Sequence, residues 1–230
     1  MMILSLSACT AQQIQSTLDT LGGASGLTTA EIGSGLKQAL EFGIGEGAQR
    51  LSQKDGYFKS PYKILLPPEA RKVTDKLKNV PGFSSLEADI LEKINRGAED
   101  AAKKAKPIFV DAIRQMTFSD AMDILMGADN AATQYLNRTT NSKLYQEFNP
   151  VIIESLDKFN ARKYWADAVN AYNKIPFVDK ANPDLDDYVT NEALKGLFSM
   201  VEKKELQIRT DVSARTTDLL KKVFAKQDNK

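Results

Sequence analysis

One block of the chain, from Asn95 to Thr140, gathers polar side chains at spacings of three and four residues. Residues spaced in this way share one face of a helix and can interact. Paired carboxylates on such a face can hold Mg²⁺ or Ca²⁺, or can serve as a general acid and a general base. The candidate side chains of this block are Asn95, Glu99, Asp111, Arg114, Asp120, Asp123 and Asp129.

The preferred interpretation of these side chains is structural. Asp120 and Asp129 lie at predicted helix N-termini, where carboxylates cap unpaired backbone N–H groups. The other expected role is a buried polar network that ties helices together, formed by Asn95, Glu99, Asp111 and Arg114. We expect Glu99 and Arg114 to be mostly inaccessible, because each follows a residue of an apolar stripe, Ala98 and Ile113 respectively.

Two further groups of residues could form sites. Arg209 and Arg215 flank a predicted helix start, where anions bind, and their guanidinium groups suit carboxylate or phosphate. An intramolecular ion pair with Glu205 or Asp211 is the favoured alternative for them. An aromatic group could line a ligand groove, although packing between helices is the commoner role of such side chains. Its members are Tyr164, Trp165, Tyr172 and Phe177.

The chain contains no histidine and a single cysteine. A Ser-His-Asp triad, a Cys-His dyad and a His-ligated zinc ion are therefore excluded. The G-x-x-x-x-G-K-[ST] motif of nucleotide-binding loops does not occur. Catalysis would depend on carboxylates, lysines, tyrosines or a metal held by oxygen atoms, and the sequence gives no reason to expect a cofactor.

The single cysteine closes a segment, Leu6-Ser7-Ala8-Cys9, that has the pattern of a bacterial lipobox. Lipidation of Cys9 would anchor the protein firmly to a membrane, since several acyl chains hold where one is marginal. We interpret residues 1–8 as the remnant of a lipoprotein signal peptide, whose basic start we expect upstream. Residues 9–27 would form the lipidated N-terminus and a flexible tether. Thr10 favours the outer membrane, facing the periplasm, because an aspartate there would resemble an inner-membrane retention signal.

Composition indicates an ordinary globular chain. The 230 residues suffice for one domain with a sizeable core, and 42% of them are hydrophobic and 27% charged. Lys and Arg number 31 and Asp and Glu 30. The resulting net charge of +1 gives no reason to expect a nucleic-acid partner, because that binding depends on clustered cations. No apolar run approaches the roughly 18 residues of a membrane-spanning helix.

Apolar periodicity and capping signals predict an all-α fold, with residues 28–230 forming a single multi-helix domain. One very short extended or strand segment is expected near 62–66. The predicted helices cover 28–53, 68–79, a long stretch from 86 that Pro107 kinks or restarts, 118–127, 130–140, 144–172 with a bend near Pro150, 185–209 and 214–226. Gly43 and Gly47, four residues apart, are expected to let another helix approach closely.

Four segments of the chain resemble a known family. The longest is NRGAEDAAKKAKPIFVDAIRQMTFSDAMDILMGADNAATQYL, over 95–136, and the others are YKILLP over 62–67, DYVTNEALKGLFSMVEKKE over 187–205 and IRTDVSARTTDLLKKVF over 208–224. They are similar to blocks of a bacterial envelope family known only as a domain of unknown function, DUF4197. The resemblance implies an exported protein or a lipoprotein, and it implies no activity.

Two functions are consistent with these observations. The favoured one is a lipid-anchored periplasmic module without catalytic activity, which binds an envelope protein or a small apolar ligand, or has a structural role. The alternative is a carboxylate-based or divalent-metal-assisted hydrolase that uses the block from Asn95 to Asp129. A pocket lined by apolar side chains would favour the first, and a cluster of acidic oxygens would favour the second.

Overall fold

The computed structural model describes residues 29–69, 72, 73, 75, 86–158, 160–215 and 217–225. Cys9, the predicted segments 1–8 and 9–27, and most of the helix expected over 68–79 lie outside the described residues. Within them every regular element is a helix, which confirms the predicted all-α domain. None of the described helices combines the length and the hydropathy that crossing a bilayer requires.

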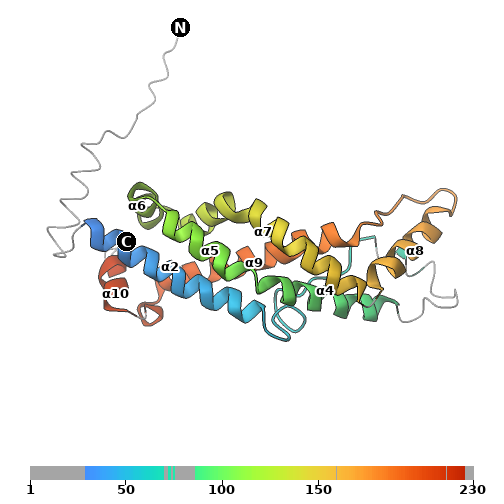
Figure 1. Cartoon of the computed structure of the whole chain (residues 1–230), viewed down its shortest axis with the longest axis horizontal. Coiled ribbons are helices and arrows are strands. Elements are labelled where there is room, and N and C mark those ends of the chain that lie inside the picture. Colours follow the sequence, from blue (N-terminus) through green and yellow to red (C-terminus); the bar gives the residue numbers. More distant parts are fainter. Residues whose placement is uncertain are drawn as a thin grey trace, which may run out of the picture.

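Four long rods form the body of the molecule (Figure 1). They are α2 (Thr29–Leu51), then α4 (Leu86–Ala102) followed by α5 (Ala105–Gln115), then α7 (Ala131–Asp157), and finally α9 (Leu185–Thr210). α2 packs against α5 and α9, and α7 packs against α4, α5 and α9, so the rods close a ring around one core. Successive rods run in opposite directions along the long axis of the molecule (Figure 1).

Short helices cover the two ends of the ring. These are α6 (Phe118–Met126), α8 (Ala161–Asn173), the 3-10 helix η1 (Val212–Ala214) and α10 (Asp218–Phe224). α6 and α10 lie at the end where α2 begins, and α8 lies at the opposite end (Figure 1). The predicted helix over 214–226 is therefore divided, because η1 covers its start and α10 begins only at Asp218.

The glycines of α2 permit a close approach of α9. A Cβ atom on Gly47 would lie 3.1 Å from Cγ of Met200, and one on Gly43 would lie 2.9 Å from Cδ1 of Ile208. Distances this short leave almost no room for a side chain at either position. The predicted role of this pair is confirmed, and the neighbouring helix is α9.

At Pro107, where a kink or a restart of the helix was expected, the structure shows a restart, and the predicted start of α6 is confirmed. α4 ends at Ala102 and α5 begins at Ala105, so Pro107 lies in the first turn of a new helix, where its missing N–H costs nothing. α6 begins at a capping box. The hydroxyl of Thr117 accepts a hydrogen bond from the Asp120 N–H (3.1 Å), and the Asp120 carboxylate accepts one from the Thr117 N–H (2.8 Å). Hydrogen bonds from Thr117 hold the pKa of Asp120 below its usual value.

α7 differs from its prediction. One helix runs through residues 141–143 and through Pro150, where two helices separated by a break were expected. The hydroxyl of Thr140 donates to the carbonyl oxygen of Leu136 at 2.6 Å, so this polar run bonds back onto its own helix. The chain breaks after Asp157 instead. There Asn160 has a φ of 52°, a left-handed conformation that asparagine tolerates better than most residues.

Candidate functional site

Asn95 on α4 is fully buried and binds the segment that was expected to be extended. Its carboxamide accepts a hydrogen bond from the Ile64 N–H at 2.8 Å and donates one to the Ile64 carbonyl at 2.9 Å. It also donates to the carbonyl of Leu91 at 2.8 Å. Residues 63–67 have no regular secondary structure, so of the two alternatives expected there, an extended segment or a strand, the strand is absent. The amide of Asn95 takes the place of the neighbouring strand that would otherwise pair with Ile64.

Glu99 lies one turn further along α4 and is 4% exposed. Its Oε1 accepts hydrogen bonds from the backbone N–H groups of Tyr57 and Phe58, both at 3.1 Å. Its Oε2 accepts from Nη1 of Arg96 at 2.8 Å, and Arg96 also pairs with Asp55 at 2.8 Å. Asn95 and Glu99 thus belong to one buried polar region. It ties α4 to the segment that follows α2 rather than to another helix.

Arg114 and Asp111 lie outside this network. The Arg114 side chain is 68% exposed, with its Nε 3.5 Å from a carboxylate oxygen of Glu41, so the expectation that it is inaccessible is wrong. Asp111 is 56% exposed and lies 3.9 Å from Nζ of Lys143. The physical reason is helical rotation: each residue turns the chain by about 100°, so the neighbour of the buried Ile113 can face water.

The carboxylates of Asp120, Asp123 and Asp129 do not converge. Asp120 caps α6, while Asp123 and Asp129 are exposed. α7 begins at Ala131, and its cap position is held by Asn130, without a side-chain capping bond. The capping role predicted for Asp129 is therefore wrong. In the described ranges of the chain no three acidic, histidine or cysteine side chains lie close enough together to hold a metal ion.

Glu205 of α9 binds the N–H groups at the start of α7. Its Oε1 accepts from the Ala132 N–H at 2.9 Å, and its Oε2 accepts from the N–H and the hydroxyl of Thr133, both at 2.8 Å. Arg209 pairs with the same carboxylate at 2.8 Å and donates to the Ile124 carbonyl, at the end of α6, at 2.7 Å. One buried ion pair therefore joins the start of α7, the end of α6 and the body of α9.

Arg215 is also buried, and it binds the last turn of α9. Its guanidinium donates to the carbonyl oxygens of Ile208 and Arg209, both at 3.0 Å, and lies 5.7 Å from the ring centroid of Phe224. Both arginines of the proposed anion site thus face helix carbonyl oxygens. The ion pair expected as an alternative is the one that Arg209 makes with Glu205.

The aromatic candidates lie in different surroundings. Trp165 and Tyr172 are buried against the bundle, and Nε1 of Trp165 donates to the Asn182 carbonyl at 3.2 Å. Tyr164 is half exposed, and Phe177 is fully exposed. Trp165 and Tyr172 pack between helices, which was the favoured interpretation of the group.

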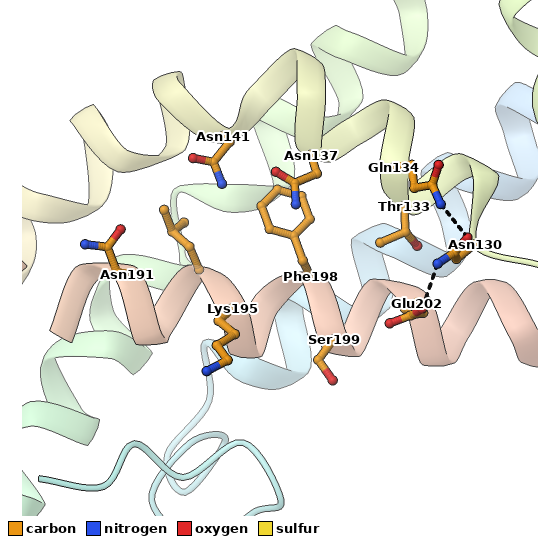
Figure 2. Close-up of a pocket in the computed structure, with 11 residues that line it drawn as sticks. Asn130, Thr133, Gln134, Asn137, Asn141, Asn191, Lys195, Phe198, Ser199 and Glu202 are labelled. Carbon is orange, nitrogen blue, oxygen red and sulfur yellow. Dashed lines mark hydrogen bonds between the residues drawn. The ribbon is translucent and has the colours of Figure 1, made fainter. Parts of the chain in front are cut away.

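A polar groove of about 460 Å³ lies between α7 and α9 (Figure 2). Most of the side chains that line it carry an amide or a hydroxyl group. The lining residues are Asn130, Thr133, Gln134, Asn137, Asn141, Asn191, Leu194, Lys195, Phe198, Ser199 and Glu202. Leu194 and Phe198 are buried and give the groove an apolar floor.

Hydrogen bonds close one end of the groove. Nε2 of Gln134 donates to Oδ1 of Asn130 at 2.8 Å, and Nδ2 of Asn130 donates to Glu202 at 3.0 Å (Figure 2). This chain of bonds crosses from α7 to α9. It holds the Asn130 and Gln134 amides in fixed orientations.

A second link between α7 and α9 lies close to Asn191, at the other end of the groove. The hydroxyl of Tyr145 donates to Oδ1 of Asp187 at 2.6 Å, and this bond raises the pKa of Tyr145 to about 12. Asn191 donates to the Asp187 carbonyl at 2.9 Å. Between the two ends, Asn137 and Asn141 are exposed and point from α7 toward α9 (Figure 2). Neither carboxamide has a hydrogen-bond partner within the part of the chain that the structure describes.

Sequence reasoning missed this groove, although its pattern is visible. Asn130, Asn137 and Asn141 lie seven and four residues apart, a spacing that puts them on one face of a helix. A row of exposed amides is an ordinary surface unless a second helix with polar side chains faces it. That pairing comes from the packing of α7 on α9, which brings together residues as far apart in the chain as Asn130 and Glu202, 72 positions.

Together, these features define an all-α bundle of four antiparallel rods with an amide-lined groove between the third and the fourth. The chain belongs to the family described as "Protein of unknown function (DUF4197)", whose model matches residues 26–225. The match confirms the family resemblance of the four sequence segments. No curated protein and no solved structure matches the chain.

Proposed function

We propose that this protein is a binding module without catalytic activity, anchored through lipidated Cys9 at the outer membrane and facing the periplasm. Its ligand is an uncharged molecule rich in hydrogen-bonding groups, and it binds in the groove between α7 and α9. The lipobox pattern and the implied export of the family support the anchor and the location. The groove supports the binding function.

The observation that carries this proposal is the pair of unpartnered carboxamides on Asn137 and Asn141. A binding site commonly joins an apolar lining to a few polar groups that fix the orientation of the ligand. Each carboxamide offers two N–H donors and one carbonyl oxygen acceptor. Lys195 and Glu202 bring opposite charges to the groove, so its lining favours an uncharged ligand. The amides favour a polar ligand over the small apolar one expected from the sequence.

The hydrogen bonds of the buried carboxylates support a function without catalysis. Among the residues whose burial the structure describes, the buried acidic ones are Glu99 and Glu205. Each accepts hydrogen bonds from backbone N–H groups and pairs with an arginine. Their acceptor positions are occupied in holding the bundle together, which leaves them poorly placed to accept a proton from a substrate.

The groove can be tested in living cells with a photo-crosslinking residue. With p-benzoylphenylalanine in place of Asn191, an exposed residue of α9 that lines the groove, we expect irradiation of the full chain to yield an adduct of discrete mass. The same residue in place of Gln146 is the control, because Gln146 is exposed on α7 but does not line the groove. The proposal fails if position 191 yields no adduct or if positions 191 and 146 yield the same adducts.

The anchor can be tested separately with Cys9→Ser. Expressed with its full signal, this variant should leave the membrane fraction while its melting temperature stays unchanged, because the expected tether separates Cys9 from the helical domain. Cell fractionation and thermal melting measure the two quantities. Retention of Cys9→Ser on outer-membrane vesicles through a high-salt wash would show that lipidation is not the anchor.

A further inference from the structure

We infer that the ligand of the groove is an extended peptide segment of a partner protein, whose main chain is bound by the carboxamides of Asn137 and Asn141. This inference rests on the proposed function and names the chemical class of its ligand. A peptide unit offers one N–H donor and one C=O acceptor, and a carboxamide offers the complementary pair.

The chain already binds its own backbone in this way at two places. Asn95 accepts from the N–H and donates to the carbonyl of Ile64. Asn173 accepts from the Ala181 N–H at 2.9 Å and donates to the Ala181 carbonyl at 3.0 Å. In both cases a helical asparagine satisfies both polar groups of one residue in a non-helical segment. Asn137 and Asn141 are helical asparagines with the same groups and no such partner in the described residues.

The spacing of the two asparagines fits an extended chain. Four residues of an α-helix rise by about 6 Å. Two residues of an extended strand rise by about 6.6 Å, and residues two apart present their N–H and C=O groups on the same side. One peptide lying along α7 can therefore offer a residue to Asn137 and the next residue of the same orientation to Asn141. The floor of Leu194 and Phe198 lies beneath this path to receive an apolar side chain.

The groove fits a peptide better than a saccharide. Phe198 is its one aromatic lining residue, and it is 7% exposed. Its ring makes an edge contact with Phe109, with the centroids 5.9 Å apart. This burial leaves little of the Phe198 ring for stacking against a sugar. The lining instead offers carboxamides, which match main-chain groups.

The test uses a displayed library of random twelve-residue peptides, selected on the full chain. We expect enriched peptides whose affinity falls about tenfold or more in the double variant Asn137→Leu, Asn141→Leu, because each asparagine contributes two hydrogen bonds. Gln146→Leu, an amide loss on the same helix outside the groove, should leave the affinity unchanged. Both asparagines are exposed, so the double variant should melt like the parent, which circular dichroism checks.

A second probe separates main-chain from side-chain recognition. An enriched peptide resynthesised with N-methyl groups at alternate residues keeps every side chain but loses the N–H donors of one side. Two such peptides exist, one methylated at the odd residues and one at the even residues, and we expect one of them to lose its binding. The inference is overturned if no peptide is enriched, or if the double variant binds the enriched peptide as tightly as the parent protein does. It is also overturned if both N-methylated peptides bind as tightly as the unmodified one. The same holds if a peptide of residues 10–27 of this chain outcompetes the selected peptides.

The photo-crosslinked adduct distinguishes this inference from the proposed function. If protease treatment of the adduct at position 191 releases the bound mass as peptide fragments, both proposals stand. A protease-resistant saccharide adduct would leave the proposed function standing and overturn the peptide. The absence of any adduct would remove both.

Discussion

Glu205→Ala is expected to lower the free energy of unfolding by about 3–5 kcal/mol, the usual cost of removing one partner from a buried ion pair. The substitution leaves the Arg209 guanidinium, whose side chain is 4% exposed, without its carboxylate. It also leaves the N–H groups of Ala132 and Thr133 without an acceptor at the start of α7. The midpoint of urea denaturation measures the loss.

Glu202→Ala is the matched control for this experiment. Glu202 lies on the same helix and also accepts a bond from the start of α7, through Asn130 at 3.0 Å, but it is exposed. Its loss should cost about 0.5 kcal/mol or less. Equal midpoints for the two variants would mean that the buried carboxylate does not hold α7, and our account of this junction would be wrong.

Glu99→Leu is expected to cost roughly 2–4 kcal/mol, because it orphans the buried N–H groups of Tyr57 and Phe58. Glu99→Gln should cost much less, since the amide oxygen can still accept both bonds. Denaturation midpoints of the two variants, compared with that of the parent, measure the difference.

Asp111→Leu serves as the control for position 99, because Asp111 is 56% exposed and its contact with Lys143 is 3.9 Å long. A change within about 0.5 kcal/mol is expected there. If Glu99→Leu and Glu99→Gln both melt like the parent and yet lose the crosslinked ligand, Glu99 serves binding and the structural role assigned to it is mistaken.

Features encoded by neighbouring residues were predictable from the sequence. The capping box of α6 depends on Thr117 and Asp120, three residues apart, and its geometry follows from the residue types alone. Gly43 and Gly47 predicted a close helix contact for a similar reason, because the absence of side chains at four-residue spacing is visible without a structure. The all-α class followed from apolar periodicity along most of the chain.

Features encoded by distant residues were not predictable. The sequence around Asp129 contains a plausible local cap, and nothing nearby indicates that Glu205 binds the start of α7 instead. The sequence predicts a break at 141–143, but the helix continues there, and the Thr140 hydroxyl donates back to the carbonyl of Leu136. It also predicts one helix over 144–172, but the chain breaks after Asp157. The groove could not be predicted for the same reason as the binding of Glu205 to the start of α7. Each wall of the groove, taken alone, is an ordinary helix face.

The hydrogen bond that the Ala132 N–H donates to Glu205 joins residues 73 positions apart, so the start of α7 cannot be capped until α9 has been synthesised. A ribosome-bound chain that ends before α9 already contains all of α7, but its first turn has no acceptor and its amide face has no opposing wall. Contacts of such long sequence separation form late, since the loop between them must close first. The packing of α9 therefore closes the ring of helices, caps α7 and forms the groove in the same step. A chain that is truncated within α9 should therefore not bind the ligand at all.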